Sequence, residues 1–313
     1  MLNGFLNINK PSGITSNDVI FKLKKILFPI FGKIKIGHTG TLDPLATGVL
    51  PIALGEATKT IQFQMEGLKS YDFTIKFGVS TTTDDSDGEI ENTSPKIPTK
   101  DEIETILPTF LGEIVQTPPK YSAIKINGKR AYTLAREGTE FEIKPRKNFI
   151  YELKLQEQIN DTEYKFNVKA QKGFYVRSIA KDIATSLSTY GHITYLHRTQ
   201  NGNFKIEETI TLDKLQKILE NKTQSLDVRN CIGDYLYPIS YGLNDILVLD
   251  ISKEQNEKLR NGVMLPTSIF QNLRDNTLYQ VHYNSTLQAI VKTTNNQLKI
   301  IRVFNLWKGK KCQ

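Results

Sequence analysis

The residues of this sequence that could carry chemistry gather in one short loop, residues 37–48. The loop reads GHTGTLDPLATG, and its middle holds one carboxylate, Asp43, among glycine, proline and threonine residues. Three interpretations are open: a loop that cradles phosphate, a loop that presents a catalytic carboxylate, or an ordinary Asp-Pro turn. The phosphate cradle is the weakest, because Gly48 is followed by Val49 and Leu50 where a P-loop has a lysine and a hydroxyl residue. The density of special residues favours the catalytic loop over the ordinary turn.

The elements around this loop indicate how Asp43 is held. The apolar run of residues 49–54, VLPIAL, has the composition of a buried strand, so we expect the loop to lie against the core. Upstream, residues 5–9 alternate like a strand and residues 10–13, KPSG, form a turn. Thr15 and Asp18 are then spaced as a capping box, which predicts the start of a helix that should end before Pro29.

The rest of the chain reads as alternating strands and helices, with a change of character near residue 244. We expect strands over residues 71–77, 150–158 and 162–170, and helices over residues 99–107, 178–188 and 211–220. No clear period marks residues 221–243, which we interpret as the exit from a first domain. Beyond them, short strands are predicted over residues 247–250, 278–283, 288–291 and 298–304, with one helix that starts at Ser252.

A basic segment, residues 118–147, stands out within the first domain. It contains Lys125, Lys129, Arg130, Arg136, Lys144, Arg146 and Lys147, with aromatic residues between them and glycines at positions 128 and 138. A run of charge is usually a solvated face. Aromatic residues between cations and glycine hinges also fit a flap that closes on RNA.

Composition excludes several classes of protein. The composition, 39% hydrophobic and 24% charged, is typical of a soluble globular protein, and 313 residues favour one large domain with a small one, or two domains. The net charge of +8 favours a polyanionic partner. Cys231 and Cys312 suggest no disulfide framework, and the four histidines lack metal-ligand spacing, so we expect no metal. Without a signal peptide or a run of about twenty apolar residues, we expect a cytoplasmic protein with no membrane partner.

The loop of residues 37–48 closely resembles the signature of the TruB family, the bacterial tRNA pseudouridine-55 synthases. The resemblance implies that Asp43 is catalytic. It also implies that Tyr71, which follows Lys69 and Ser70, is the active-site tyrosine of the family. In residues 173–178, GFYVRS, it implies that Arg177 is the arginine that pairs with the aspartate. Read without the family, Tyr71 is one residue of a strand's aromatic face and Arg177 an exposed arginine near a helix start.

The resemblance further implies which residues bind the substrate. Tyr175 and Leu196 would shape the uracil pocket, and His38 would fill the space that the flipped nucleotide leaves, although a buried histidine bonded to backbone is the alternative. The remaining implied contacts, each with a plain surface lysine or arginine as its alternative, are Lys10, Lys59, Lys129 and Arg130. The last two lie in the segment that is equivalent to the thumb loop of the family. Thr82 and Phe174 depart from the family pattern.

The fold implied by the resemblance is α+β. A central, mostly antiparallel mixed sheet flanked by helices and loops would occupy residues 1–243, and a small PUA-like β-barrel residues 244–313. The implied reaction breaks the C1′–N1 bond of uridine, turns the uracil and forms a C1′–C5 bond, with no cofactor. The implied substrate is the T stem-loop of tRNA, bound by a monomer with no obligatory protein partner.

Two other hypotheses stay open. The first is a dyskerin-type subunit that depends on guide RNA and protein partners, and residues 118–147 count against it because that segment replaces external help in gripping RNA. The second is a non-catalytic RNA-binding protein, and the presence of Asp43, Tyr71 and Arg177 speaks for activity instead. A synthase that also helps tRNA to fold would combine catalysis and binding.

Overall fold

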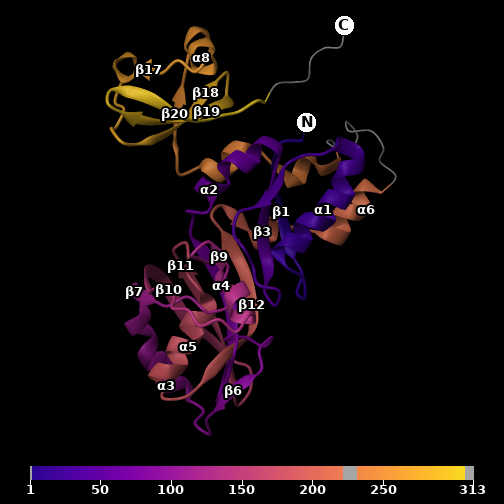
Figure 1. Cartoon of the computed structure of the whole chain (residues 1–313), viewed down its shortest axis with the longest axis vertical. Coiled ribbons are helices and arrows are strands. Elements are labelled where there is room, and N and C mark those ends of the chain that lie inside the picture. Colours follow the sequence, from indigo (N-terminus) through magenta and orange to yellow (C-terminus); the bar gives the residue numbers. More distant parts are fainter. Residues whose placement is uncertain (1, 221–230, 307–313) are drawn as a thin grey trace.

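The chain builds one large mixed sheet and one small sheet that lie end to end along the long axis of the molecule (Figure 1). The computed structural model describes residues 2–220 and 231–306. Cys312 and residues 221–230 of the expected exit segment lie outside the described residues. No helix in the described residues is long and apolar enough to cross a membrane.

The large sheet has the strand order β14-β1-β3-β12-β4-β11-β10-β7, with β15 on β1, β2 on β3 and β13 on β12. Only the pairs β1–β14 and β12–β3 are parallel among these described strands, so the prediction of a mostly antiparallel mixed sheet is confirmed. The strands are β1 (Gly4–Lys10), β2 (Ile36–His38), β3 (Thr47–Leu54), β4 (Lys69–Phe77), β7 (Gly112–Gln116), β10 (Arg146–Gln158), β11 (Glu163–Ala170), β12 (Gly191–Asn201), β13 (Phe204–Lys205), β14 (Ile210–Thr211) and β15 (Leu236–Tyr237).

Helices cover this sheet and bury its apolar residues in one large cluster that includes Leu23, Leu50, Phe73 and Ile179. The helices are α1 (Ser16–Phe31), α3 (Lys100–Ile106), α5 (Val176–Ser186) and α6 (Leu212–Leu219). Because this cluster is closely packed, the sheet is a rigid support for the loops at its edge.

Helix α1 starts where the sequence predicts and ends later than the sequence predicts. The Thr15 side chain accepts a hydrogen bond from the Asp18 N–H, and the Asp18 carboxylate accepts one from the Thr15 N–H, as the capping box predicts. The predicted end before Pro29 is wrong, because the helix continues to Phe31. A proline removes only its own N–H, and the Gly32 N–H still donates to the Phe28 carbonyl at 3.0 Å in that last turn.

The small sheet has the order β16-β18-β19-β20-β17 and carries one helix whose start at Ser252 is again a capping box. Its elements are β16 (Leu247–Asp250), α8 (Lys253–Arg260), β17 (Leu265–Pro266), β18 (Leu278–Tyr283), β19 (Thr286–Thr294) and β20 (Gln297–Val303). An apolar cluster with Phe5, Val49, Ile290 and Phe304 joins the two sheets.

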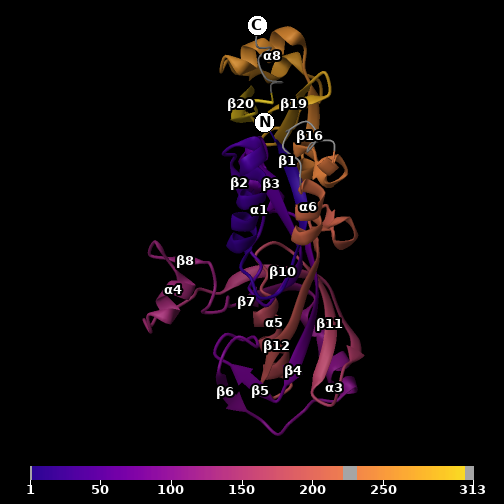
Figure 2. The same cartoon turned by 90° about the vertical axis from the view of Figure 1, so that its right-hand side faces the viewer.

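The shorter elements complete the chain, and one group of them projects from the body. The basic segment of residues 118–147 extends sideways, on the side that also carries α1 and β2 (Figure 2). It contains β8 (Lys125–Ile126), β9 (Lys129–Arg130) and α4 (Ala131–Arg136), while β5 (Val79–Thr81), β6 (Ile90–Thr93), η1 (Gly55–Thr60), α2 (Ile61–Gln64), η2 (Leu107–Phe110), η3 (Ile206–Glu208), η4 (Gly233–Tyr235), η5 (Ile239–Leu243) and η6 (Thr267–Ile269) connect the larger elements.

Candidate active site

The Asp43 loop lies between β2 and β3 and is held from beneath by a buried lysine. Lys10, at the end of β1, is 0% exposed, and its Nζ donates to the carbonyls of Pro11 at 2.9 Å, Pro44 at 3.1 Å and Ala46 at 2.6 Å. An ammonium has three protons to donate, so none remains for RNA. The expectation of a solvated turn lysine is wrong, and the expected contact of Lys10 with the substrate is not supported: the side chain holds the loop.

A second buried cation, Arg198 of β12, holds the other side of the same loop. Its side chain is 1% exposed and donates to the carbonyls of Val49 at 2.8 Å and Gly40 at 3.0 Å, and it lies near the Tyr71 phenol. Glycine at position 48 lets the backbones of β3 and β12 approach each other closely here. The φ of Gly48 is +98°, and a Cβ there would lie 2.3 Å from the Arg198 carbonyl oxygen. Burial lowers the pKa of the Arg198 guanidinium.

The sequence reasoning missed Arg198, although a signal was present. Side chains alternate across a strand, so Arg198 shares the buried face of β12 with Leu196. An arginine two positions from a buried leucine on the same strand lies on the same face, so it indicates a buried cation that binds carbonyls or carboxylates inside the protein.

Arg177, in the first turn of α5, bridges two carboxylates. Its Nε lies 3.0 Å from Asp43 Oδ2 and 3.6 Å from Asp85 Oδ2, and its side chain is 4% exposed. Its Nη1 donates to the Thr83 carbonyl and its Nη2 to the Tyr121 carbonyl, both at 2.9 Å. The alternative of an exposed arginine is therefore wrong, and the guanidinium is fixed on three sides.

Asp85 is the second residue whose role the sequence reasoning missed. It is 4% exposed, and its Oδ1 accepts hydrogen bonds from Thr83 Oγ1 at 2.5 Å and from the Asp87 N–H at 3.1 Å. Asp85 belongs to the loop of residues 80–88, which also contains Thr82, one of the two departures from the family pattern. Its function in the structure is to present a second carboxylate to Arg177.

The ionisation of Asp43 results from opposing effects. Burial raises the pKa of its carboxyl, and the charge of Asp85 raises it further, whereas the Arg177 guanidinium lowers it; the net direction is upward. The Asp43 side chain is nevertheless 34% exposed, so a ligand can reach it. The site presents a reachable, partly desolvated carboxylate.

The predicted aromatic and apolar residues Tyr71, Tyr175 and Leu196 lie on β4, directly before α5 and on β12. Tyr71 on β4 lies opposite Arg198 on β12, and Leu196 lies opposite Phe73. Both Tyr71 and Leu196 are 6% exposed. Tyr175, directly before α5, is close enough to Asp43 that the carboxylate charge, together with burial, raises the pKa of the phenol. The structure thus places Tyr175 beside Asp43, and it places Tyr71 and Leu196 as buried residues on the paired strands β4 and β12.

His38 and the remaining predicted cations lie at different distances from this centre. His38, at the end of β2, is half-buried, and its Nδ1 accepts a 3.4 Å hydrogen bond from the Gly40 N–H. Burial and Arg198 lower the pKa of His38, which keeps the imidazole neutral at pH 7. Lys59 does not join the site: its Nζ binds Glu56 Oε2 at 2.7 Å and the Val303 carbonyl of the small sheet at 2.9 Å.

Lys129 and Arg130 lie on the projecting basic segment. The Lys129 side chain is 64% exposed, with its Nζ 3.5 Å from Glu137 Oε2, and Arg130 donates to the Ala123 carbonyl. The base of the segment reaches the active site through the Tyr121 carbonyl, which accepts from Arg177. Among the described residues, no group of three or more His, Cys, Asp or Glu side chains is placed to hold a metal ion.

Comparison with known proteins decides the family. The model described as TruB family pseudouridylate synthase (N terminal domain) matches residues 28–176, and that of the tRNA pseudouridylate synthase B C-terminal domain matches residues 177–244. A tRNA pseudouridine synthase B from Wolbachia pipientis is 38% identical over 98% of this chain and 100% of the relative. The chain belongs to the TruB family. Another tRNA pseudouridine synthase B, from Ehrlichia ruminantium, is 42% identical over 97% of this chain and 99% of the relative.

Solved structures show which fold this TruB-family chain shares with other proteins. A chain in a Cbf5-Nop10-Gar1 complex matches it with a TM-score of 0.73 and 25% identity, over 96% of this chain and 84% of that one. A chain in the archaeal box H/ACA sRNP Nop10-Cbf5 complex matches with a TM-score of 0.71 and 22% identity, over 96% and 85%. The α+β pseudouridine-synthase fold is therefore confirmed.

Proposed function

We propose that this TruB-family tRNA pseudouridine synthase isomerises the uridine at position 55 in the T loop of tRNA, as a monomer without guide RNA, protein partner or cofactor, in the cytoplasm. The observation that carries the proposal is the fixed Asp43–Arg177 ion pair, 3.0 Å long, at a carboxylate that a ligand can still reach. Pseudouridine formation needs a carboxylate near C1′ and a pocket for the base. Asp43 supplies the carboxylate, and the buried side chains of Tyr71 and Leu196 support such a pocket.

The reaction conserves all atoms of the nucleotide. The C1′–N1 bond breaks, the uracil turns, C1′ joins C5, the proton on C5 leaves, and N1 ends with a proton. Asp43 acts on the nucleotide as an anion, and Arg177 stabilises that anion and fixes its direction. Asp85 in turn holds Arg177, so the two carboxylates and one guanidinium act as a unit.

The surrounding side chains hold the base once it leaves its stack. Tyr71 lies against the uracil and Arg198 fixes its phenol, while Leu196 and Tyr175 form the pocket walls. Neutral His38 occupies the space that the base leaves, which offsets an unstacking cost of a few kcal/mol. The phenol of Tyr71 also serves in proton transfer.

The other parts of the chain provide the grip on RNA. The basic segment of residues 118–147 acts as a thumb over the T stem, through Lys129 and Arg130. Residues 1–243 form the catalytic domain. Residues 244–313 form a PUA-like domain, supported by the small sheet and its helix α8.

A guide-dependent subunit is not favoured. The relatives that cover nearly the whole chain at 38% to 42% identity are named tRNA pseudouridine synthase B, whereas the Cbf5 chain of the solved complex is 25% identical. The thumb also supplies within one chain the contacts that such a subunit would obtain from partners.

The test is an incubation of purified protein with an unmodified tRNA transcript, without guide RNA or cofactor. Pseudouridine is then mapped at single-nucleotide resolution. One new pseudouridine, at position 55, is the expected result. Tight binding without product would overturn the proposal and favour a partner-dependent or purely RNA-binding protein.

A further inference from the structure

A pocket outside the active site is lined by three lysines and by no aspartate or glutamate. It has a volume of about 500 Å³ and is lined by Lys24, Lys33 and Lys35 together with Phe28, Ile36 and Ile61. We call these six residues the lysine groove. It is open to solvent, between the end of α1, the edge strand β2 and the η1–α2 segment.

The charge in the lysine groove is not neutralised by any residue that the structure describes. Residues 19–42 contain five lysines and no aspartate or glutamate. Lys24, Lys33 and Lys35 are all exposed, and none of them forms an ion pair or a side-chain hydrogen bond with another described residue. Elsewhere many exposed lysines, such as Lys100 and Lys147, face a glutamate within 4.0 Å. The uncompensated charge fits an anionic ligand.

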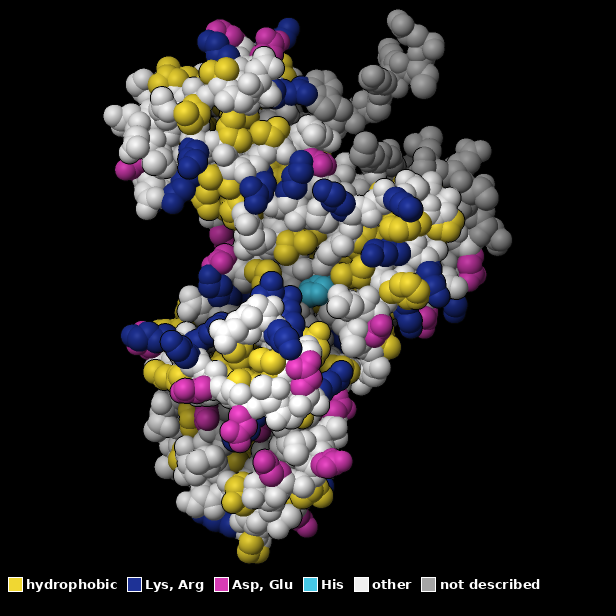
Figure 3. Space-filling view, viewed as in Figure 1, with side chains coloured by type: hydrophobic (Ala, Val, Ile, Leu, Met, Phe, Trp, Pro, Cys, Tyr) yellow, Lys and Arg dark blue, Asp and Glu magenta, His cyan; other side chains and the backbone are white. Residues whose placement is uncertain are grey.

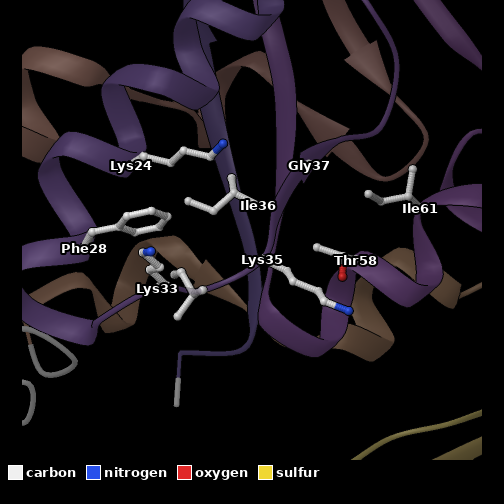
Figure 4. A pocket seen from close by; sticks show the side chains of 9 residues that line it. Lys24, Phe28, Lys33, Lys35, Ile36, Gly37, Thr58 and Ile61 are labelled. Carbon is white, nitrogen blue, oxygen red and sulfur yellow. The ribbon is translucent and has the colours of Figure 1, made fainter.

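The shape of the lysine groove fits a polyanion with flat apolar parts. Lys24 and Lys33 lie near the Phe28 ring on one side of Ile36, and Lys35 reaches toward Thr58 on the other (Figure 4). Lysines bind phosphates as point charges, while an aromatic and aliphatic floor suits a ribose or a base. The surface over α1 likewise shows Lys and Arg side chains among hydrophobic ones (Figure 3).

The position of the lysine groove connects it to the active site. Ile36 in its floor begins β2, and His38 ends the same three-residue strand. The basic thumb projects on the side where α1 and β2 lie (Figure 2). An RNA held between the thumb and His38 therefore reaches the groove if it continues past β2.

We infer that the lysine groove binds backbone phosphates of a part of the tRNA outside the T stem-loop. The inference rests on the proposed function, because it takes tRNA as the substrate. The inference predicts that full-length tRNA makes contacts that the isolated T stem-loop does not make. The stem-loop ends at the thumb and the active site, and only full-length tRNA extends into the lysine groove.

The test compares two RNAs, a full-length tRNA transcript and the isolated T stem-loop, in equilibrium binding at several salt concentrations. The variant carries Lys24→Ala, Lys33→Ala and Lys35→Ala. The control removes three other exposed lysines, each beside a glutamate on the far end of the large sheet, by Lys96→Ala, Lys100→Ala and Lys154→Ala. Both variants lose the same net charge, and thermal unfolding checks that both are folded.

We expect the groove variant to bind full-length tRNA at least tenfold more weakly than the control does, while both bind the stem-loop alike. The slope of log affinity against log salt for full-length tRNA should fall by about 2–3, since each of three lost phosphate contacts removes about 0.7 to 0.9. Equal weakening on both RNAs, equal weakening in the control, or no weakening would each overturn the inference. Turnover of the stem-loop tests the proposed function separately, because it does not depend on the groove.

Discussion

Replacing Arg177 by glutamine tests the electrostatic design of the site most directly. The guanidinium Nε lies 3.0 Å from Asp43 and 3.6 Å from Asp85. A cation at such distances typically lowers the pKa of a carboxyl by about 1–3 units, and each unit corresponds to about 1.4 kcal/mol. In Arg177→Gln the pKa of Asp43, already raised by burial, should therefore rise by about 1–3 units more.

The expected result is a shift of the acid limb of the pH–rate profile. Catalysis needs ionised Asp43, and a higher pKa keeps the carboxyl protonated up to a higher pH, so the limb should move upward by about 1–3 units. Arg177→Lys keeps the charge but lacks the fork that also binds the carbonyls of Thr83 and Tyr121. Its limb should move less, and its maximal rate should still fall.

The assay follows release of tritium from C5 of the target uridine, since that proton leaves during the reaction. It is run as single turnover with enzyme in excess, from about pH 5 to pH 9, a range that covers the expected shift. A limb in Arg177→Gln that coincides with that of the unsubstituted protein would refute the reasoning.

Thermal stability gives a second readout of Arg177→Gln. The substitution leaves the carboxylate of Asp85, 6% exposed, without its cation, and breaking such a pair typically costs about 3–5 kcal/mol. The pKa of Asp43 would also lie further above its value in the unfolded chain. Stability from such a group is present at low pH and is lost as pH rises, so the loss of Tm should grow from about pH 4 to pH 7.

Three other predictions concern single parts of the site. Asp43→Asn should abolish product while tRNA affinity changes little; residual turnover near that of the unsubstituted protein would exclude Asp43 as the catalytic carboxylate. Lys129→Glu with Arg130→Glu should weaken tRNA binding and flatten its salt dependence, because lost phosphate contacts release fewer counterions, and an unchanged slope would show that the thumb does not touch the RNA backbone. Arg198→Met should lower the free energy of unfolding by at least about 1–3 kcal/mol, because buried carbonyls lose their donor, and unchanged denaturant midpoints would show that the loop is held by other contacts.

The elements of the fold were largely predictable from local patterns. Helices start at Thr15, Thr99 and Ser252 as predicted, and in the structure each of these starts is a capping box. Alternation placed the strand at residues 71–77, which the structure extends to Lys69. Such signals succeed because each depends on residues three or four positions apart, or on period two.

The site was predictable in part, and the missed residues share one cause. Asp43, Tyr71 and Arg177 came from motifs, but Asp85 and Arg198 acquire their roles only through partners more than 80 residues away. Lys10 shows the same limit, since its acceptors at Pro44 and Ala46 are brought under it by the pairing of β1 with β3. The sequence around a charged residue near a turn does not show whether the fold will bury that residue.

The position of β1 in the sheet has a consequence for how the protein matures. This strand pairs with β3 on one side and with β14 and β15 on the other, so residues 4–10 meet residues 210–211 and 236–237. During synthesis the first strand leaves the ribosome early, but its second edge is not fully paired until residue 237 has emerged. Closing contacts of such high sequence separation is slow. Modification activity should therefore appear late in refolding, after most helical signal has returned, because the loop of Asp43 rests on that strand.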